Sequence, residues 1–325
     1  MILPLAFLVD WLVGDPDWLY QRRRWSLPHP VAVMGWLAAW LEKRFNAGRF
    51  RLIKGAIGWS ILVLSTAIAG WLLQWALAQA PYGWLGLVVI ASMFLAFNSL
   101  ARHVAKVADG LDEGLEAGRL AVSHIVGRDP SQLDQHAVAR ASIESLAENF
   151  SDGVIAPLFW FAVAGLPGLM AYKAINTLDS MWGYRCERYE RFGKAAARID
   201  DAANWLPARL SGFLIVTACF ISRTASAGHA WRAMRRDASK HNSPNAGWPE
   251  AAIAGGLGIR LAGPRWYKNH TVNAPFIGRK ENRTNLLAHD IRRALRLYQL
   301  CGFVTLLACL AVGLFTGALS DNFFT

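Results

Sequence analysis

The sequence predicts an all-α, polytopic integral membrane protein with about four to six membrane segments, one of them broken or re-entrant, joined by cytoplasmic helices and loops. Two observations predict this class. The chain of 325 residues is 54% hydrophobic and only 18% charged, with 15 Trp. It also contains several apolar runs of about the 20 residues that a helix needs to cross a bilayer core of roughly 30 Å.

The apolar segments set the expected order of the elements. The N-terminal segment near 1–14 has no basic region and contains Asp10, so we expect an inserted or interfacial helix rather than a signal peptide. A small-residue helix is expected near 250–263. We expect one membrane-embedded catalytic domain over residues 1–325, whose membrane segments lie near 55–80, 83–98, 153–175, 205–222 and 300–319.

The segment 153–175 presents a topological problem. The stretches on both sides of it, 99–152 and 176–203, are basic, and the positive-inside rule places both on the cytoplasmic face. A single crossing would separate them. The run "VIAPLFWFAVAGLPGLM" is interrupted at Pro157 and again at Gly165–Gly168, which favours a re-entrant hairpin. The alternative is one kinked span followed by a basic loop outside.

The polar parts of the chain predict helices and one ordered loop. Residues 99–127 and 131–151 are expected to be two helices, with Asp129 as a cap and Pro130 in the first turn. Residues 237–246 predict a loop that leads into the small-residue helix. The net charge of +11 follows the positive-inside pattern, so an anionic membrane and anionic substrates account for it and no nucleic-acid partner is expected.

A row of acids precedes the broken segment. Glu144, Glu148 and Asp152 are four residues apart, so on a helix Glu144 and Glu148 are close neighbours on one face. Asp152 lies about 80° and about 12 Å from Glu144, too far for all three to share one ion without a bend. A neighbouring pair beside Asn149 can hold Mg²⁺ together with water. The alternative pairs Glu144 with Arg140 and makes Asp152 a helix cap.

Two further segments repeat the mixture of carboxylate, amide and cation. "AYKAINTLDS" places Lys173, Asn176 and Asp179 at three-residue steps. "ARIDDAANWLPAR" combines two acids with an amide and two cations, namely Asp200, Asp201, Asn204, Arg198 and Arg209. Such mixtures suit a site for metal-bound phosphates, in which acids hold the metal and Lys or Arg hold phosphate oxygens.

Long colinear motifs resemble one family. "DWLVGDP", "HPVAVMG", "SIESLAENFSDGVIAPLFW", "AYKAINTLDSMWGYR", "RIDDAANWLPARL" and "DASKHNSPNAGWPEAAIAGGLGIRLAGP" are similar to the motifs of the integral-membrane adenosylcobinamide-phosphate synthases, the CbiB/CobD family. The resemblance covers most of the chain. Phe150 departs from the small polar residue that is usual in the family, so no role is assigned to that side chain.

The resemblance implies cobalamin biosynthesis in a bacterial inner membrane, with the site facing the cytoplasm. The implied ligase reaction forms an amide between a corrin propionate of adenosylcobyric acid and (R)-1-amino-2-propanol or its phosphate. It implies ATP as co-substrate and Mg²⁺, with the corrinoid as substrate rather than cofactor. A homo-oligomer or a complex with other cobalamin-assembly enzymes is compatible with it.

This reaction suggests roles for the candidate residues. The metal ligands would be Glu144, Glu148, Asp152, Asp200 and Asp201, and Glu148 would also be catalytic. Phosphates would be held by Lys173, Arg198 and Arg209, while the base for the amine is left open between Asp179 and His241. The residues expected to orient substrate amides are Asn149, Asn176, Asn204, Asn242 and Ser243, together with His241.

Three other classes of protein compete with this interpretation. A transporter of a corrinoid or another anionic solute also uses broken helices and membrane acids, but no matching halves are visible in the sequence. A prenyl or phosphatidyl transferase would hold Mg²⁺-diphosphate, but its aspartate-rich signatures are not reproduced. A structural membrane subunit would tolerate loss of the carboxylates.

Overall fold

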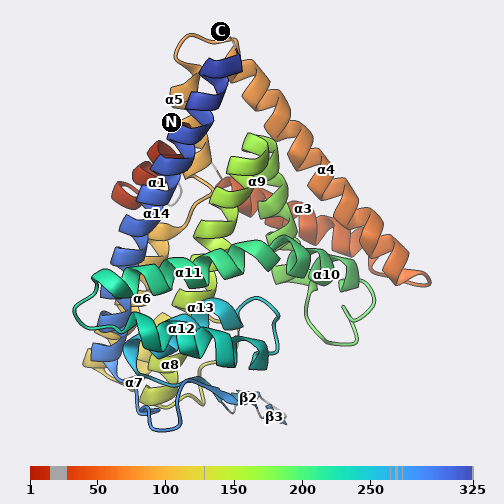
Figure 1. Ribbon diagram of the computed structural model, residues 1–325. Coiled ribbons are helices and arrows are strands. Elements are labelled where there is room, and N and C mark those ends of the chain that lie inside the picture. The colour runs from red at the N-terminus through yellow and green to blue at the C-terminus, as the bar shows by residue number, and fades with distance from the viewer. Residues whose placement is uncertain (15–27, 128, 264, 268–269, 273, 324–325) are drawn as a thin grey trace. The chain divides into compact units, whose positions relative to one another are not determined.

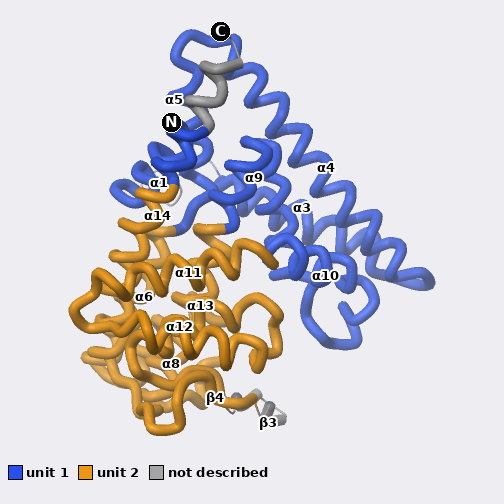
Figure 2. Tube along the Cα trace, viewed as in Figure 1, with its two compact units in different colours: residues 1–96, 156–204, 309–325 blue, residues 97–155, 205–308 orange. Residues whose placement is uncertain are grey.

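A computed structural model describes residues 1–14, 28–127, 129–263, 265–267, 270–272 and 274–323. The backbone contacts divide the chain into two compact units (Figure 2). Unit 1 comprises residues 1–96, 156–204 and 309–325, and unit 2 comprises residues 97–155 and 205–308. The expected single catalytic domain stays a prediction.

The lengths and apolar character of the helices confirm the predicted fold class. Among the described residues, four helical stretches are long and apolar enough to cross a membrane: Arg51–Ala78, Gly83–Glu113, Gln135–Trp182 and Ala288–Phe315. The second stretch is interrupted at 93–96 and the third at Ala164 and Gly165. A bent pair, Lys194–Ala203 with Trp205–Ile221, brings the number to five if it counts as one span. The chain is therefore an all-α, multi-pass membrane protein.

Unit 1 is a bundle of helices that pack around α9 (Ala156–Trp182). Its core includes Leu62, Leu166, Leu178 and Trp182, each 1% exposed or less. The other helices of the unit are α1 (Ile2–Leu12), α3 (Pro30–Phe45), α4 (Arg51–Ala78), α5 (Gly83–Ser92) and α10 (Lys194–Ala203). Helix α4 presents large apolar side chains outward, as a lipid-facing helix does: Ile57, Ile61, Leu64, Ile68 and Trp71.

Helix α9 is a hairpin of two helical arms (Figure 1). The break lies at Ala164 and Gly165, where Gly165 has φ 61° and ψ −152°. A Cβ atom on Gly168 would lie 2.5 Å from the carbonyl oxygen of Trp160. Eight residues of straight helix would span about 12 Å, so the chain must reverse between these two residues. The predicted broken segment is confirmed, with its reversal at the first glycine.

The hairpin lies along α4. Its second arm begins beside Gly70, where a Cβ atom would lie 2.9 Å from the carbonyl oxygen of Leu166. The arm ends at Trp182, and a Cβ atom on Gly58 would lie 3.4 Å from the indole ring of that residue. Twelve residues of α4 separate these contacts, a distance of about 18 Å along the helix axis. Pro157, which the sequence suggested as a break, instead lies in the first turn of α9, where its missing N–H is tolerated.

The basic residues of unit 1 gather where the second arm ends. The last turn of α3 contains Lys43 and Arg44, and α4 begins at Arg51. Arg188, from the loop after α9, pairs with Glu42 of α3 at 2.6 Å. Residues 55–96 and 309–325 contain no Lys or Arg. The positive charge of unit 1 is therefore distributed unevenly along the chain.

Unit 2 surrounds helix α13 (Gly247–Leu257), in which every residue except the partly exposed Trp248 is buried. A Cβ atom on Gly255 would lie 2.5 Å from the carbonyl oxygen of His229, so the glycine allows close approach of α12 (Ala227–Asp237). The helix begins and ends earlier than the expected 250–263, and the segment before it contains a 3₁₀ turn at Ala238–Lys240. The other helices are α6 (Phe97–Glu113), α7 (Leu115–Ser123), α8 (Gln135–Phe150), the π-helical η1 (Ser151–Ile155), α11 (Trp205–Ile221), the 3₁₀ helix η2 (Ala238–Lys240) and the first part of α14 (Ala288–Phe323).

Two short antiparallel strand pairs complete unit 2. Strand β1 (Leu261–Ala262) pairs with β4 (Phe276–Ile277), and β2 (Arg265–Tyr267) pairs with β3 (His270–Val272). These strands were not foreseen, because two or three residues of β-structure leave no periodic pattern in a sequence.

Two local expectations for unit 2 were wrong. The helix expected over 99–127 is divided at Gly114, which has φ 150°, a conformation that favours glycine. The cap of the following helix is Asp134, which accepts a hydrogen bond from the N–H of Ala137 at 2.7 Å. The expected cap, Asp129, instead forms a turn with the N–H of Ser131.

Candidate functional site

An acid and amide cluster in unit 1 joins two of the predicted segments. Asp200 of α10 is only 7% exposed, and its Oδ2 accepts a hydrogen bond from Asn204 at 3.0 Å. Asn176 of α9 lies close to the carboxylate of Asp200, and Asp179 is close enough to repel it electrostatically. The fold thus brings together residues that are more than twenty positions apart in the sequence.

A second layer of contacts holds this cluster in place. The hydroxyl of Tyr172 donates to Oδ1 of Asn204 at 2.8 Å, so the amide can turn its NH₂ group toward Asp200. Tyr172 packs against Ala156 and Ala203 in a small apolar core. Ala156 begins the first arm of α9 and Tyr172 lies in the second arm, so the fold of the hairpin holds Tyr172, which in turn orients the amide of Asn204.

Asp200 retains a free acceptor. Its Oδ1 is buried and has no hydrogen-bond partner among the described residues. Asp201, the next residue, is exposed and lies within electrostatic range of Arg185. A buried carboxylate oxygen without a donor is unfavourable unless a cation or a polar ligand reaches it.

The donor set fits a hard divalent cation. Asp200 and Asp201 offer oxygen ligands, which Mg²⁺ prefers, and Mg²⁺ commonly uses one or two carboxylates with water and substrate phosphates. In the part of the chain that the structure describes, no group of three or more His, Cys, Asp or Glu is arranged to hold a metal ion. The predicted metal ligands Asp200 and Asp201 stay predictions.

Two predicted phosphate-binding cations also belong to unit 1. Lys173 is 8% exposed and lies three residues before Asn176 on α9. Arg198 is exposed on α10, two residues before Asp200. Arg185 was not singled out from the sequence, because it is one of several arginines in the loop after α9.

The row of acids that precedes the hairpin lies in unit 2. Glu144 is buried, and its Oε1 accepts the N–H of Ala262 at 2.7 Å. Glu148 is exposed, and the side-chain amide of Asn149 donates to the carbonyl oxygen of Ser145 at 2.9 Å. Asp152 lies inside the π-helical turn η1, so it is not the cap of a separate helix. Single π-turns occur frequently at functional sites.

The predicted His241 loop is ordered by its own side chains. Nδ1 of His241 accepts the N–H of Ser243 at 3.0 Å, and Nε2 lies 3.6 Å from Oε1 of Glu250. The hydroxyl of Ser243 accepts the N–H groups of Asn245 and Ala246, each at 3.2 Å. Asn242 is exposed. Glu250 is 1% exposed and was missed, although an acid just after a proline in a small-residue helix is a visible signal.

Arg209 lies between two indole rings. Its guanidinium carbon is 4.0 Å from the ring centre of Trp205 and 4.5 Å from that of Trp248. Stacking on both sides fixes the plane of the guanidinium group. This residue therefore keeps its predicted role only if a substrate phosphate reaches the edge of the group.

The predicted residues form two sets. Unit 1 contains Lys173, Asn176, Asp179, Arg198, Asp200, Asp201 and Asn204. Unit 2 contains Glu144, Glu148, Asn149, Asp152, Arg209, His241, Asn242 and Ser243. The prediction that both sets meet in one hollow stays a prediction.

Comparison with known proteins identifies the family. The family model described as CobD/Cbib protein matches residues 3–298, which include every predicted site residue. The chain belongs to the CobD/CbiB family. The family motifs contribute the acid and amide cluster of unit 1 as well as the His241 loop of unit 2.

Relatives match this CobD/CbiB chain over nearly their full length. The "Cobalamin biosynthesis protein CobD" of Brucella anthropi is 48% identical over 92% of both chains. The proteins with the same name from Rhizobium meliloti and Rhodobacter capsulatus are each 46% identical, over 94% of both chains and over 96% of this chain and 97% of the relative, respectively. No solved structure matches the chain significantly.

Proposed function

We propose that this chain is a membrane enzyme of cobalamin biosynthesis that forms an amide bond. The acid would be a corrin propionate of adenosylcobyric acid, and the amine would be (R)-1-amino-2-propanol or its phosphate. The family match supports the pathway, since the relatives are named cobalamin biosynthesis proteins. The observation that carries the chemistry is the buried, unpartnered oxygen of Asp200 beside other acids and amides.

The reaction needs an activated carboxylate, because a carboxylate ion does not react with an amine at neutral pH. In the proposed first step, an oxygen of the propionate attacks the γ-phosphorus of ATP, an acyl phosphate forms and ADP leaves. In the second step the amine nitrogen attacks the acyl carbon, the amide bond forms and phosphate leaves. The nitrogen loses a proton to a base of the enzyme.

The residues of unit 1 suit the handling of phosphate. Asp200 and Asp201 would hold Mg²⁺, which when bound neutralises charge on phosphate groups. Lys173 and Arg198 would contact the phosphate oxygens of the aminopropanol phosphate. Asn204, held by Tyr172, keeps Asp200 oriented toward the site, so that its second oxygen stays available.

The contacts of His241 favour Asp179 as the base. Nδ1 of His241 already accepts a backbone N–H, so the neutral ring carries its proton on Nε2, toward Glu250. Neither nitrogen then offers a lone pair to an amine. Asp179 has a carboxylate on the second arm of the hairpin and is the remaining candidate.

Reconstitution tests the proposal. Purified chain in lipid nanodiscs would be mixed with adenosylcobyric acid, aminopropanol phosphate, Mg²⁺ and ATP, and the amide product would be detected by mass spectrometry. We expect product from the wild type and from Glu187→Gln, which changes an exposed acid of the same unit. Asp200→Asn should give little product while keeping the protein folded. Corrinoid uptake into sealed vesicles without any product would favour the transporter instead.

A further inference from the structure

A basic pocket in unit 2 is not part of the predicted site. It has a volume of about 680 Å³ and lies where α12, η2 and the segment 275–281 meet Arg260. Its lining consists of Arg236, Lys240, Arg260, Pro275, Phe276, Gly278, Arg279, Lys280 and Glu281. The volume falls within the range of about 300–1,000 Å³ that is usual for small-molecule sites.

The pocket carries an excess of positive charge. Five of its residues are cationic and only Glu281 is acidic. Behind the lining, Asp237 is buried and accepts hydrogen bonds from Nε of Arg236 at 2.8 Å and from Nζ of Lys240 at 2.7 Å. Counting both acids, three positive charges remain uncompensated. Asp237 also accepts the N–H of Gly278 at 3.1 Å, so it fixes two cations and the loop of the pocket together.

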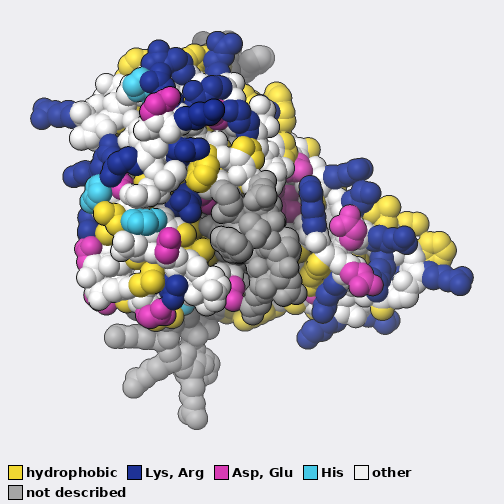
Figure 3. Space-filling model, turned by 90° about the horizontal axis from the view of Figure 1, so that it is seen from below, with side chains coloured by type: hydrophobic (Ala, Val, Ile, Leu, Met, Phe, Trp, Pro, Cys, Tyr) yellow, Lys and Arg dark blue, Asp and Glu magenta, His cyan; other side chains and the backbone are white. Residues whose placement is uncertain are grey.

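Three of the cations have no carboxylate partner among the described residues: Arg260, Arg279 and Lys280. Like charges gathered around one hollow repel each other, and this repulsion weakens when an anion enters. Figure 3 shows that Lys and Arg side chains are also spread widely over one face of the molecule. The pocket differs from an open basic surface because its cations converge on a hollow.

Arg260 is prepared to donate. Its guanidinium carbon lies 4.1 Å from the ring centre of Phe276, and this stacking fixes the plane of the group. Its Nε is buried and has no hydrogen-bond partner among the described residues. A buried, charged donor without an acceptor is unfavourable, and a phosphate oxygen is the acceptor that a planar guanidinium matches best.

We propose that this pocket binds the polyphosphate of a nucleoside triphosphate. The inference rests on the proposed function, which needs a phosphoryl donor. A triphosphate carries three to four negative charges, which match the three uncompensated cations, and its chain of phosphates can reach several of them at once. Arg260 is the central donor, while Arg279 and Lys280 contact phosphates from the opposite segment.

Binding of a non-hydrolysable ATP analogue, AMP-PNP, tests the inference directly. The titration uses the full-length chain in phosphatidylcholine nanodiscs with Mg²⁺ and neither corrinoid nor amine. We expect two variants to weaken AMP-PNP binding about 10-fold or more: Arg260→Ala and Lys280→Glu, the second at an exposed position. The reason is that hydrogen bonds to charged groups are stronger than those between neutral groups. Arg232→Ala, which removes an exposed cation of α12 outside the pocket lining, should leave Kd unchanged.

Each further outcome decides one question. Unchanged affinity in both pocket variants would overturn the inference, and Lys280→Glu keeps the test valid if Arg260→Ala does not fold. Inorganic tripolyphosphate should compete with AMP-PNP, since the phosphates are the proposed contacts. If phosphatidylglycerol in the nanodiscs abolishes AMP-PNP binding in the wild type, the pocket takes lipid headgroups and the inference is wrong.

The binding assay separates this inference from the proposed function. If wild-type protein binds AMP-PNP through the pocket but makes no amide product, the proposed reaction fails and the nucleotide site stands. If the wild type makes product and the pocket variants show an unchanged KM for ATP, the reaction stands and the nucleotide binds elsewhere.

Discussion

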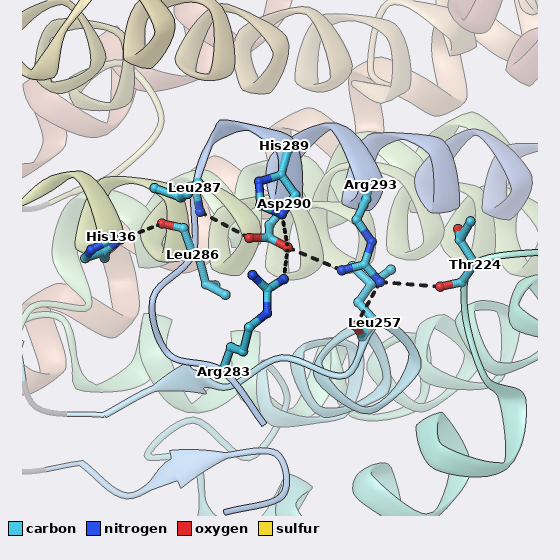
Figure 4. A network of polar contacts seen from close by, with 9 residues as sticks. All are labelled: His136, Thr224, Leu257, Arg283, Leu286, Leu287, His289, Asp290 and Arg293. Carbon is cyan, nitrogen blue, oxygen red and sulfur yellow. Dashed lines mark hydrogen bonds and ion pairs between the residues drawn. The ribbon is translucent and has the colours of Figure 1, made fainter. Parts of the chain in front are cut away.

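Two buried aspartates, one in each unit, differ in how their oxygens are satisfied. Asp290 of unit 2 is 0% exposed, and its carboxylate contacts Arg283 at 2.8 Å, Arg293 at 3.3 Å and the N–H of Leu287 at 3.1 Å. His289 lies 3.3 Å from the same group, and Figure 4 shows how these side chains converge on it. Asp200 of unit 1 is 7% exposed, accepts a hydrogen bond from the amide of Asn204 and retains an oxygen without a partner among the described residues.

The difference separates structural acids from candidate functional ones. Arg293 also donates to the carbonyl oxygen of Leu257 at 3.1 Å, so the Asp290 network connects the start of α14 to the end of α13 (Figure 4). Each of these partners of Asp290 is a group of the protein itself, so the network stabilises the contact between the two helices. The partners of Asp200 leave one buried carboxylate oxygen without a hydrogen bond among the described residues. Both aspartates are buried, so burial does not distinguish them. They differ in the number of hydrogen-bond donors and cations that contact their oxygens.

The largest expected effect on stability comes from Asp290→Ala. Removing the carboxylate leaves several cationic groups without their partner, which typically costs about 3–5 kcal/mol of unfolding free energy. Denaturant titration of the purified protein in mixed micelles would measure this loss. The matched control is Asp112→Ala, whose partner Arg292 lies at an exposed position, and there the loss should be about 0–1 kcal/mol. Equal losses in both variants would remove the structural role.

Asp200→Asn should have the opposite profile. Because no cation of the described chain pairs with Asp200, the neutral amide should leave the unfolding free energy unchanged or slightly higher. Amide-product turnover should fall by about 100- to 1,000-fold, the effect of removing one preorganised electrostatic group. Turnover and denaturation would be measured on the same preparation. A stability loss as large as that of Asp290→Ala would place Asp200 among the structural acids.

Asp237 adds a pH dependence to the comparison. Burial raises the pKa of this carboxyl, but hydrogen bonds from Arg236, Lys240 and the N–H of Gly278 outweigh it and lower the pKa to about 2. An unfolded aspartate titrates near 3.9. The stabilisation is therefore complete above about pH 4 and is lost as the pH falls toward 2, and it amounts to something on the order of 2 kcal/mol.

Comparing wild type with Asp237→Asn would measure this term. The difference in their unfolding free energies should be constant from pH 7 to about pH 5 and should shrink between about pH 4 and pH 2.5. A difference that stays constant down to the lowest pH would show that the carboxylate is not held in its charged form.

The smallest expected effect concerns Ser243. Its hydroxyl already accepts two backbone N–H groups ahead of α13, so Ser243→Ala should cost about 1 kcal/mol of stability, as loss of a helix cap does. Turnover should be unchanged. If turnover falls while stability holds, the predicted role in orienting a substrate amide is the correct one.

The sequence predicted the membrane helices well because lipid imposes a simple rule. A spanning helix must be apolar for about 20 residues, and α4 and α14 satisfy this rule with few polar interruptions. The break at Gly165 was also foreseeable, since glycine is the residue that adopts φ 61° with least strain. Pro157 misled, because a proline in a first helical turn gives the same sequence signal as a true break.

Side-chain commitments were harder to predict. The spacing of Lys173, Asn176 and Asp179 predicted a common face, but only the fold shows that Asp200 packs beside it. The contact of Arg260 with Phe276 depends on the pairing of β1 with β4, which no local pattern encodes. The turn at Ser243 could have been foreseen, since serine commonly bonds to backbone N–H groups two residues ahead.

The reversal in α9 has a consequence for the order of assembly. At this point the backbone N–H of Leu166 donates to the side-chain oxygen of Gln74 at 2.8 Å, so a neighbouring helix supplies the acceptor that the interrupted helix lacks. Ribosomes complete Gln74 some ninety residues before they reach Leu166. During N- to C-terminal synthesis Gln74 therefore enters the bilayer before Leu166. Its side-chain oxygen is already present when the N–H of Leu166 needs an acceptor, so this N–H does not stay without a hydrogen bond in the apolar core of the membrane.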